Sequence, residues 1–218
     1  TLSSSSAASD VYKRQAYDHG FASPFCNLWF AVSDGTMPFI PKNALVVYRE
    51  LYGAVGPNEG QRLTLKQIAE AIRANELPDE KLEYRRADPS IFKNEGGPTI
   101  AEELGRFGVY FTKADNNRPA GWQQVRLRLE EYEGAPLLQI FSTCKHLIRT
   151  LPALQHDPTK PEDLDTKSED HAADALRYGL MSRPYFRAAP RQREPIYGIE
   201  RASLEELWKT QPTKKRTW

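Results

Sequence analysis

The sequence has few cysteines and no long apolar segment, and these absences exclude several classes of protein. Cys26 and Cys144 are the only cysteines, which argues against a disulfide scaffold or a thiolate zinc site and favours a reducing compartment. Apolar runs such as Leu28–Val32 are far shorter than the ~18 residues of a membrane-spanning helix, so we expect no membrane partner. The sequence also lacks a Gly-x4-Gly-Lys-Ser/Thr phosphate loop and a Gly-x-Ser-x-Gly nucleophile elbow. We therefore expect neither ATP hydrolysis nor serine-esterase chemistry from this polypeptide.

The net charge of +1 does not indicate any class of binding partner, but the charges are unevenly distributed along the sequence. Residues 183–218 contain nine basic and four acidic side chains together with four prolines, whereas the rest of the chain is net acidic. We therefore separate residues 183–218 from the body as a basic, Pro-containing C-terminal tail. Such a tail suits DNA or a protein partner, and a solvated tail would have the same composition.

The first fifteen residues have an unusual composition and are predicted to be non-native. A stretch of mostly Ser and Ala is followed by Asp-Val-Tyr-Lys-Arg-Gln at 10–15, without the apolar core and cleavage site of a signal peptide. This hexapeptide resembles the translation of a transposon adapter used in sequencing libraries. We expect residues 1–15 to be adapter-derived and the natural sequence to begin near Ala16, inside a gene cut short at its 5′ end.

The hydrophobic period alternates between that of strands and that of helices. Strands are predicted at 16–18, 25–33, 43–52, 82–87, 109–111 and 136–141. Helices are predicted at 65–75, 99–107, 121–132, 143–151 and 168–182. This order indicates an α/β protein in which an antiparallel three-strand meander is extended by parallel strands. It matches the ribonuclease H-like fold, a central mixed sheet with helices on both faces.

Four aspartates occupy corresponding ends of the predicted elements. Asp18 ends the first strand and Asp88 follows the fourth, while Asp170 and Asp174 lie four residues apart on the last helix and share a face. In the ribonuclease H-like layout the first and fourth strands are neighbours whose ends meet the final helix, so the four carboxylates should converge. Two divalent cations bound there, ~3.5–4 Å apart, could activate water and stabilise the leaving oxygen of a phosphodiester. Each aspartate alone could equally be a turn or cap residue.

Three short motifs contain these aspartates: Ala-Tyr-Asp-His-Gly at 16–20, Ala-Asp-Pro-Ser at 87–90 and Asp-His-Ala-Ala-Asp-Ala-Leu-Arg-Tyr at 170–178. Together they resemble the nuclease domain of the large terminase subunit of tailed bacteriophages. Lys-Ala at 113–114, Gly-Trp-Gln-Gln-Val-Arg at 121–126 and the segment 138–151 resemble elements that the family has between the motifs. The resemblance extends from Ala16 to Ser182 and implies a ribonuclease H-like nuclease domain over 16–182.

The resemblance implies a metal-dependent endonuclease that cuts concatemeric viral DNA during genome packaging. Its catalytic and metal-binding residues would be Asp18, Asp88 and a carboxylate of the last helix, holding two Mg²⁺ or Mn²⁺ ions. Asp170 and Asp174 are both candidates for the ligand from the last helix. Asp170 is slightly preferred because the predicted helix places it in the first turn. The implied partners are double-stranded DNA, the portal ring, the small terminase subunit and an N-terminal ATPase domain missing from this chain. The implied location is the cytoplasm of the infected bacterial host.

Three basic residues, Lys113, Arg118 and Arg126, are candidate DNA contacts, since two metal ions alone do not hold a duplex. The alternative is a solvated helix face. Two other functions also stay open. Another ribonuclease H-like nuclease, of the resolvase or transposase type, would need a different last-helix motif. The other is a catalytically inactive docking module of the packaging motor in which the Asp cluster is vestigial; the presence of all the expected carboxylates favours the enzyme.

Overall fold

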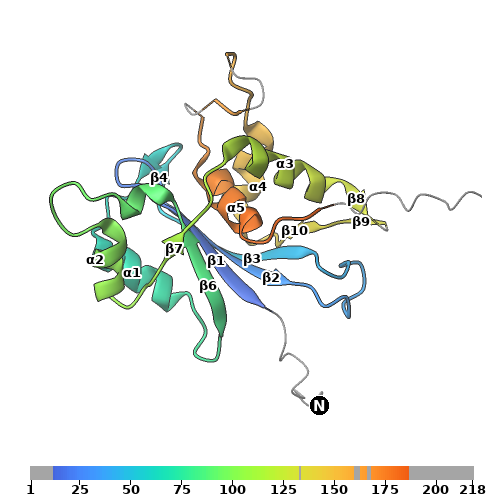
Figure 1. Cartoon of the computed structure of the whole chain (residues 1–218), viewed down its shortest axis with the longest axis horizontal. Helices are drawn as coiled ribbons and strands as arrows, with labels where there is room; N and C mark the ends of the chain where they lie inside the picture. Colours follow the sequence, from blue (N-terminus) through green and yellow to red (C-terminus); the bar gives the residue numbers. More distant parts are fainter. Residues whose placement is uncertain (1–11, 133, 160–162, 166–167, 187–218) are drawn as a thin grey trace, which may run out of the picture. The chain divides into compact units, whose positions relative to one another are not determined.

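A six-stranded mixed sheet forms the centre of the protein in the computed structural model (Figure 1). The structure describes residues 12–132, 134–159, 163–165 and 168–186. The compact unit that contains the sheet extends to Tyr185. Most of the predicted tail, 187–218, and most of the predicted adapter segment, 1–11, therefore lie outside the described residues.

The order of strands in the sheet is β10-β3-β2-β1-β6-β7. The antiparallel meander consists of β1 (Lys13–Asp18), β2 (Cys26–Val32) and β3 (Leu45–Tyr52). It is extended by parallel strands: β6 (Leu82–Ala87) beside β1, β7 (Thr112–Lys113) beside β6, and β10 (Leu138–Ile140) beside β3. The predicted mixed sheet is thus confirmed. Residues 13–15, assigned above to the adapter-derived segment, form the first half of β1 and pair with both β2 and β6.

Helices cover both faces of the sheet, as predicted (Figure 1). One face carries α1 (Leu65–Ala74) and α2 (Ile100–Arg106), each begun by a threonine capping box, at Thr64 and Thr99. The other face carries α3 (Arg118–Leu129), α4 (Lys145–Thr150) and α5 (His171–Met181). Two 3₁₀ turns follow strands or helices, η1 (Pro89–Phe92) and η2 (Leu151–Ala153). No helix in the described part of the chain is long and apolar enough to cross a membrane.

Several predicted boundaries were wrong, and local chemistry explains each. The strand predicted at 109–111 is irregular, because Val109 and Phe111 are buried beneath α1 and α2 without a strand partner, and pairing begins only at β7. The helix predicted from residue 121 begins at Arg118, since Asn117 caps it and Pro119 is tolerated in its first turn. The last helix begins at His171 rather than 168, so Asp170 precedes its first turn instead of lying in it.

Two short hairpins were not predicted. One pairs β4 (Ala54–Gly56) with β5 (Glu59–Gly60), and the other pairs β8 (Glu131–Tyr132) with β9 (Ala135–Pro136). Both are too short to show a strand period in the sequence. The first contributes a side chain to the site described below.

The sheet separates two apolar cores, and the alternation of side chains along β1 determines which residue faces which helix. Tyr17 is fully buried with Ile68 and Ile72 of α1, whereas Ala16 is fully buried in the core beneath α5. Since successive strand residues point to opposite faces, Asp18 faces α5 together with Ala16. The last residue of β1 is thereby directed toward the helix that carries the other aspartates.

Helix α5 lies close to the sheet at Gly179, where a Cβ atom would lie 2.3 Å from Phe30 Cζ. We expect Gly179→Ala to destabilise the protein by about 1–3 kcal/mol, because this buried contact leaves no room for a methyl group. Gly105→Ala in α2 is the matched control, since its Cβ would lie 3.4 Å from the Tyr110 ring and should be neutral or stabilising by up to about 1 kcal/mol. Urea unfolding of both variants measures the difference, and equal stabilities would contradict this packing.

Candidate active site

The site lies where the carboxyl ends of β1 and β6 meet the N-terminus of α5. Tyr17 pairs with Ala87 in the parallel ladder, and the Asp88 amide donates a 3.0 Å hydrogen bond to the Tyr17 carbonyl. This register places Asp18 and Asp88 at neighbouring strand ends. The Asp88 carboxylate also caps η1 by accepting a 2.8 Å bond from the Ser90 amide, which fixes its orientation.

The Asp18 carboxyl group is buried, with 5% of the residue exposed, and lies 3.0 Å from His171 Nδ1 of α5. Burial raises the pKa of Asp18 to about 7; the His171 hydrogen bond opposes this rise, and the charges of Asp174 and Asp88 add to it. The carboxylates from β1, β6 and α5 are therefore close enough to repel one another. The convergence of Asp18, Asp88, Asp170 and Asp174 as metal ligands stays a prediction.

The two aspartates at the start of α5 have different surroundings. Asp170 is the N-cap residue but its side chain makes no capping hydrogen bond, and burial and Asp174 raise its pKa to about 6. Asp174 lies in the first turn and accepts hydrogen bonds from Arg118 Nη1 at 2.9 Å and Arg177 Nε at 3.2 Å. Asp174 thus pairs with two arginines at hydrogen-bond distance, whereas the ion pair of Asp170 with Arg118 Nη2 is longer, at 3.7 Å.

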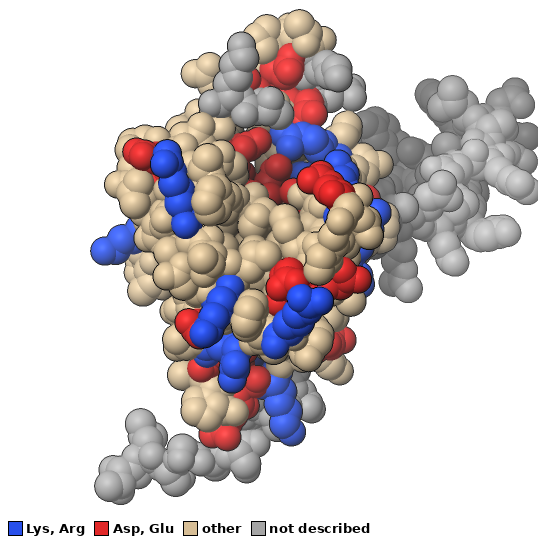
Figure 2. Space-filling view, turned by 90° about the vertical axis from the view of Figure 1, so that its left-hand side faces the viewer, with Lys and Arg blue, Asp and Glu red and all other residues tan. Residues whose placement is uncertain are grey.

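The three basic residues predicted to contact DNA occupy different places. Arg118 is the first residue of α3 and forms ion pairs with Asp163, Asp170 and Asp174, so its guanidinium belongs to the site itself. Lys113 is exposed at the end of β7, beside Ala87 in the ladder, and Arg126 is exposed further along α3. In the upper part of the face shown in Figure 2, acidic and basic side chains lie side by side around a hollow.

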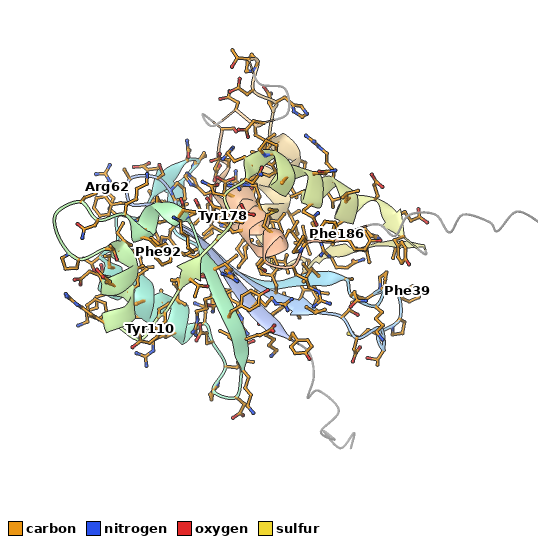
Figure 3. The ribbon with its side chains drawn as sticks, in the orientation of Figure 1. Phe39, Arg62, Phe92, Tyr110, Tyr178 and Phe186 are labelled. Carbon is orange, nitrogen blue, oxygen red and sulfur yellow. The ribbon has the colours of Figure 1, made fainter. Side chains whose placement is uncertain are left out.

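Three further polar residues lie at the site: Tyr178, known from the sequence only as the last residue of the 170–178 motif, and Asn58 and Asn116, which the sequence did not single out. Tyr178 lies where α5 crosses the sheet (Figure 3), and burial together with the charges of Asp18 and Asp174 raises its pKa. Asn58 lies in the turn between β4 and β5, and its Oδ1 accepts a 3.2 Å hydrogen bond from His171 Nε2. Asn116 accepts a 2.8 Å bond from Arg177. Turn and core residues of these types carry no distinctive sequence signal, because their spacing reveals nothing about which helix they will meet.

The candidate ligands suit a hard divalent cation, since they are carboxylate oxygens. The four aspartates also carry more negative charge than the positive charge of Arg118 and Arg177 can balance. Within the described residues, however, no three His, Cys, Asp or Glu side chains are grouped tightly enough to hold a metal ion. The contacts above give the reason: His171 holds Asp18, the Ser90 amide holds Asp88, and Arg118 with Arg177 holds Asp174. The residues fit a metal site by their chemistry, and Asp18, Asp88 and Asp174 would each have to give up one of these contacts to share one ion.

Comparison with solved structures identifies the fold. A large terminase from a thermophilic bacteriophage matches with a TM-score of 0.62 and 17% identity, over 80% of this chain and 40% of that one. The nuclease domain of the P22 large terminase matches with a TM-score of 0.59 and 18% identity, over 79% of this chain and 81% of that one. No family model and no curated protein matches the sequence. The chain therefore has the ribonuclease H-like fold of terminase nuclease domains and spans 40% of the length of the thermophilic phage protein.

The raised pKa of Asp18 predicts how stability depends on pH when EDTA is present. The folded value of about 7 exceeds the unfolded value of about 4, so the folded state binds more protons in this interval and stability falls as pH rises through it. Asp18 also raises the pKa of His171, which acts in the same direction. Asp18→Asn should therefore reduce the loss of stability between about pH 5 and pH 8 and be about 1–2 kcal/mol more stable than wild type at about pH 8.

Urea unfolding in EDTA at both pH values measures this effect. Asp79→Asn, which changes an exposed carboxylate beyond the site, is the control and should behave as wild type. An equal loss of stability in wild type and Asp18→Asn would contradict the assignment of a buried, repelled carboxylate at Asp18.

Proposed function

We propose that this chain is the nuclease domain of a phage terminase large subunit, a metal-dependent endonuclease that cuts concatemeric viral DNA during packaging. The observation that carries the proposal is that Asp18 and Asp88 lie at neighbouring strand ends, where the charge of Asp174 of α5 also acts on the Asp18 carboxyl group. The fold it shares with the thermophilic phage and P22 proteins supports the same assignment. Because those identities are low, the activity is inferred from the site.

Asp18, Asp88 and one or both of Asp170 and Asp174 would hold two Mg²⁺ or Mn²⁺ ions. Bound there, the ions would activate a water molecule and stabilise the leaving oxygen of the phosphodiester. The protein itself positions the ligands. Asp18 and Asp88 lie at neighbouring strand ends, and α5, which begins beside Asp170 and contains Asp174, packs on the face of the sheet toward which Asp18 points. His171 orients the buried Asp18 carboxyl group through its Nδ1 atom. Asn58 Oδ1 contacts Nε2 of the same imidazole and so fixes the orientation of the His171 ring.

Double-stranded DNA is the proposed substrate, with Lys113 and Arg126 as exposed candidates for phosphate contacts. Arg118 is already paired with three carboxylates, which favours a role within the site over a phosphate contact. The further proposed partners are the portal ring, the small terminase subunit and an ATPase domain. The cytoplasm of the infected bacterial host is the proposed location. We expect no ATP hydrolysis from this polypeptide.

The proposal predicts that Asp18→Asn and Asp88→Asn each reduce DNA cleavage by at least about a hundredfold, because each removes a cation ligand. Folding should be retained, since each substitution also removes a mutual repulsion. Nicking of supercoiled plasmid in Mg²⁺, Mn²⁺ or EDTA measures the effect, with Asp79→Asn as an exposed control expected to cut as wild type. Cleavage in EDTA, or wild-type nicking by either site variant, would contradict the metal-site assignment.

A further inference from the structure

The guanidinium of Arg118 connects two separate groups of carboxylates. Its Nε donates a 2.8 Å hydrogen bond to Asp163 Oδ1, on the polar loop that precedes α5. Its two terminal nitrogens face α5, with Nη1 at 2.9 Å from Asp174 Oδ2 and Nη2 at 3.7 Å from Asp170 Oδ2. Arg118 therefore uses one edge for Asp163 and the other for the aspartates of the candidate metal site.

The contact with Asp163 is the fixed end of this arrangement. Asp163 Oδ1 also accepts hydrogen bonds from Trp122 Nε1 at 3.1 Å and from the Leu164 amide at 2.8 Å. Trp122 is itself buried in the core, with 4% exposed. The carboxylate that holds Arg118 Nε is thus oriented by two further donors, one of which cannot move without disturbing the core.

The backbone of α3 determines where Arg118 lies. Asn117 caps the helix through a 3.2 Å bond from the Ala120 amide, so Arg118 is held in the first turn. At Gly121 a Cβ atom would lie 2.2 Å from Arg177 Cγ, which shows how closely α3 approaches α5. Arg118 reaches Asp174 because of this close approach, while Arg177 reaches the same carboxylate from within α5.

We propose that Arg118 is a positioning residue that competes with a metal ion for Asp174, and that Asp163 weakens this competition by holding the guanidinium at Nε. The inference rests on the proposed nuclease function and concerns how its metal affinity is controlled. A cation that binds Asp174 must compete with Arg118 for the same oxygens. When Arg118 yields them, it keeps its bond to Asp163 and Asp174 keeps its bond to Arg177, so neither charge is left without a partner.

The proposal predicts opposite effects for two substitutions on either side of one ion pair. Arg118→Gln removes the competitor and should raise Mn²⁺ affinity by roughly three- to tenfold. Asp163→Asn keeps the acceptor oxygen but removes the negative charge that holds Arg118 Nε, so the guanidinium pairs more strongly with the α5 aspartates and Mn²⁺ affinity should fall by a similar factor. In the double variant, Asp163→Asn should have no further effect, because the residue through which it acts is gone.

Isothermal titration of the full chain with Mn²⁺ measures these affinities, and thermal unfolding in EDTA and in Mn²⁺ provides a second readout. Arg106→Gln, which removes an exposed arginine paired with Glu103 on α2, is the matched control and should bind Mn²⁺ as wild type. In EDTA, Arg118→Gln should melt below wild type, and Mn²⁺ should raise its melting temperature by more than it raises that of wild type. If Arg118→Gln does not fold, Arg118→Lys replaces it with the same expected sign, because a single ammonium group cannot hold both carboxylate groups.

The outcomes separate this inference from the function on which it rests. Failure of the wild-type protein to bind Mn²⁺ would overturn the proposed metal-dependent function and this inference with it. Wild-type binding with both single variants weakened would leave the function standing and overturn the competition, since Arg118 would then only support the shape of the site. An effect of Asp163→Asn that persists in the Arg118→Gln background would likewise overturn it.

Discussion

Mutual repulsion among carboxylates is the constraint around which this end of the protein is organised. The fold gathers Asp18, Asp88 and Asp174 where two strand ends meet a helix, and burial deprives Asp18 of the water that would otherwise stabilise its charge. This repulsion is reduced by cationic and hydrogen-bonding side chains that pair with the aspartates, among them His171, Arg118 and Arg177. Among the described residues, Arg118 of α3 balances this charge through its ion pairs with Asp163 of the polar loop and with Asp170 and Asp174.

The sheet could be predicted from the sequence because its strands have strong local signals. Apolar and β-branched residues make β2 and β3 evident, and threonine caps with apolar faces mark α1 and α2. The boundaries that failed depend on tertiary contacts or on single residues. The segment near Val109 has strand composition but is buried without pairing, and the start of α3 follows from one asparagine cap rather than from any periodicity.

The site was predictable only in part. Aspartates at the ends of strands can be found once the order of strands is known, because parallel neighbours end at the same edge. The counter-charges cannot be found in this way. In the sequence, Arg118 cannot be distinguished from a solvent-exposed helix residue. It reaches Asp174 because α3 approaches α5 closely at Gly121. Asn58 lies on a hairpin too short to be recognised, so its contact with His171 required the fold.

The order of strands also determines when the site can exist during folding. The β1–β2–β3 meander joins neighbours in sequence, but β6 and β10 are added to its two sides only after long intervening segments of the chain. The hydrogen bond between Asp18 and His171 spans 153 residues, and Arg118 meets Asp174 across 56. Contacts of such separation form late, because each must close a long loop. We therefore expect a growing or partly folded chain to form the β1–β2–β3 meander before the site, because His171 and Asp174 reach Asp18 only when α5 docks.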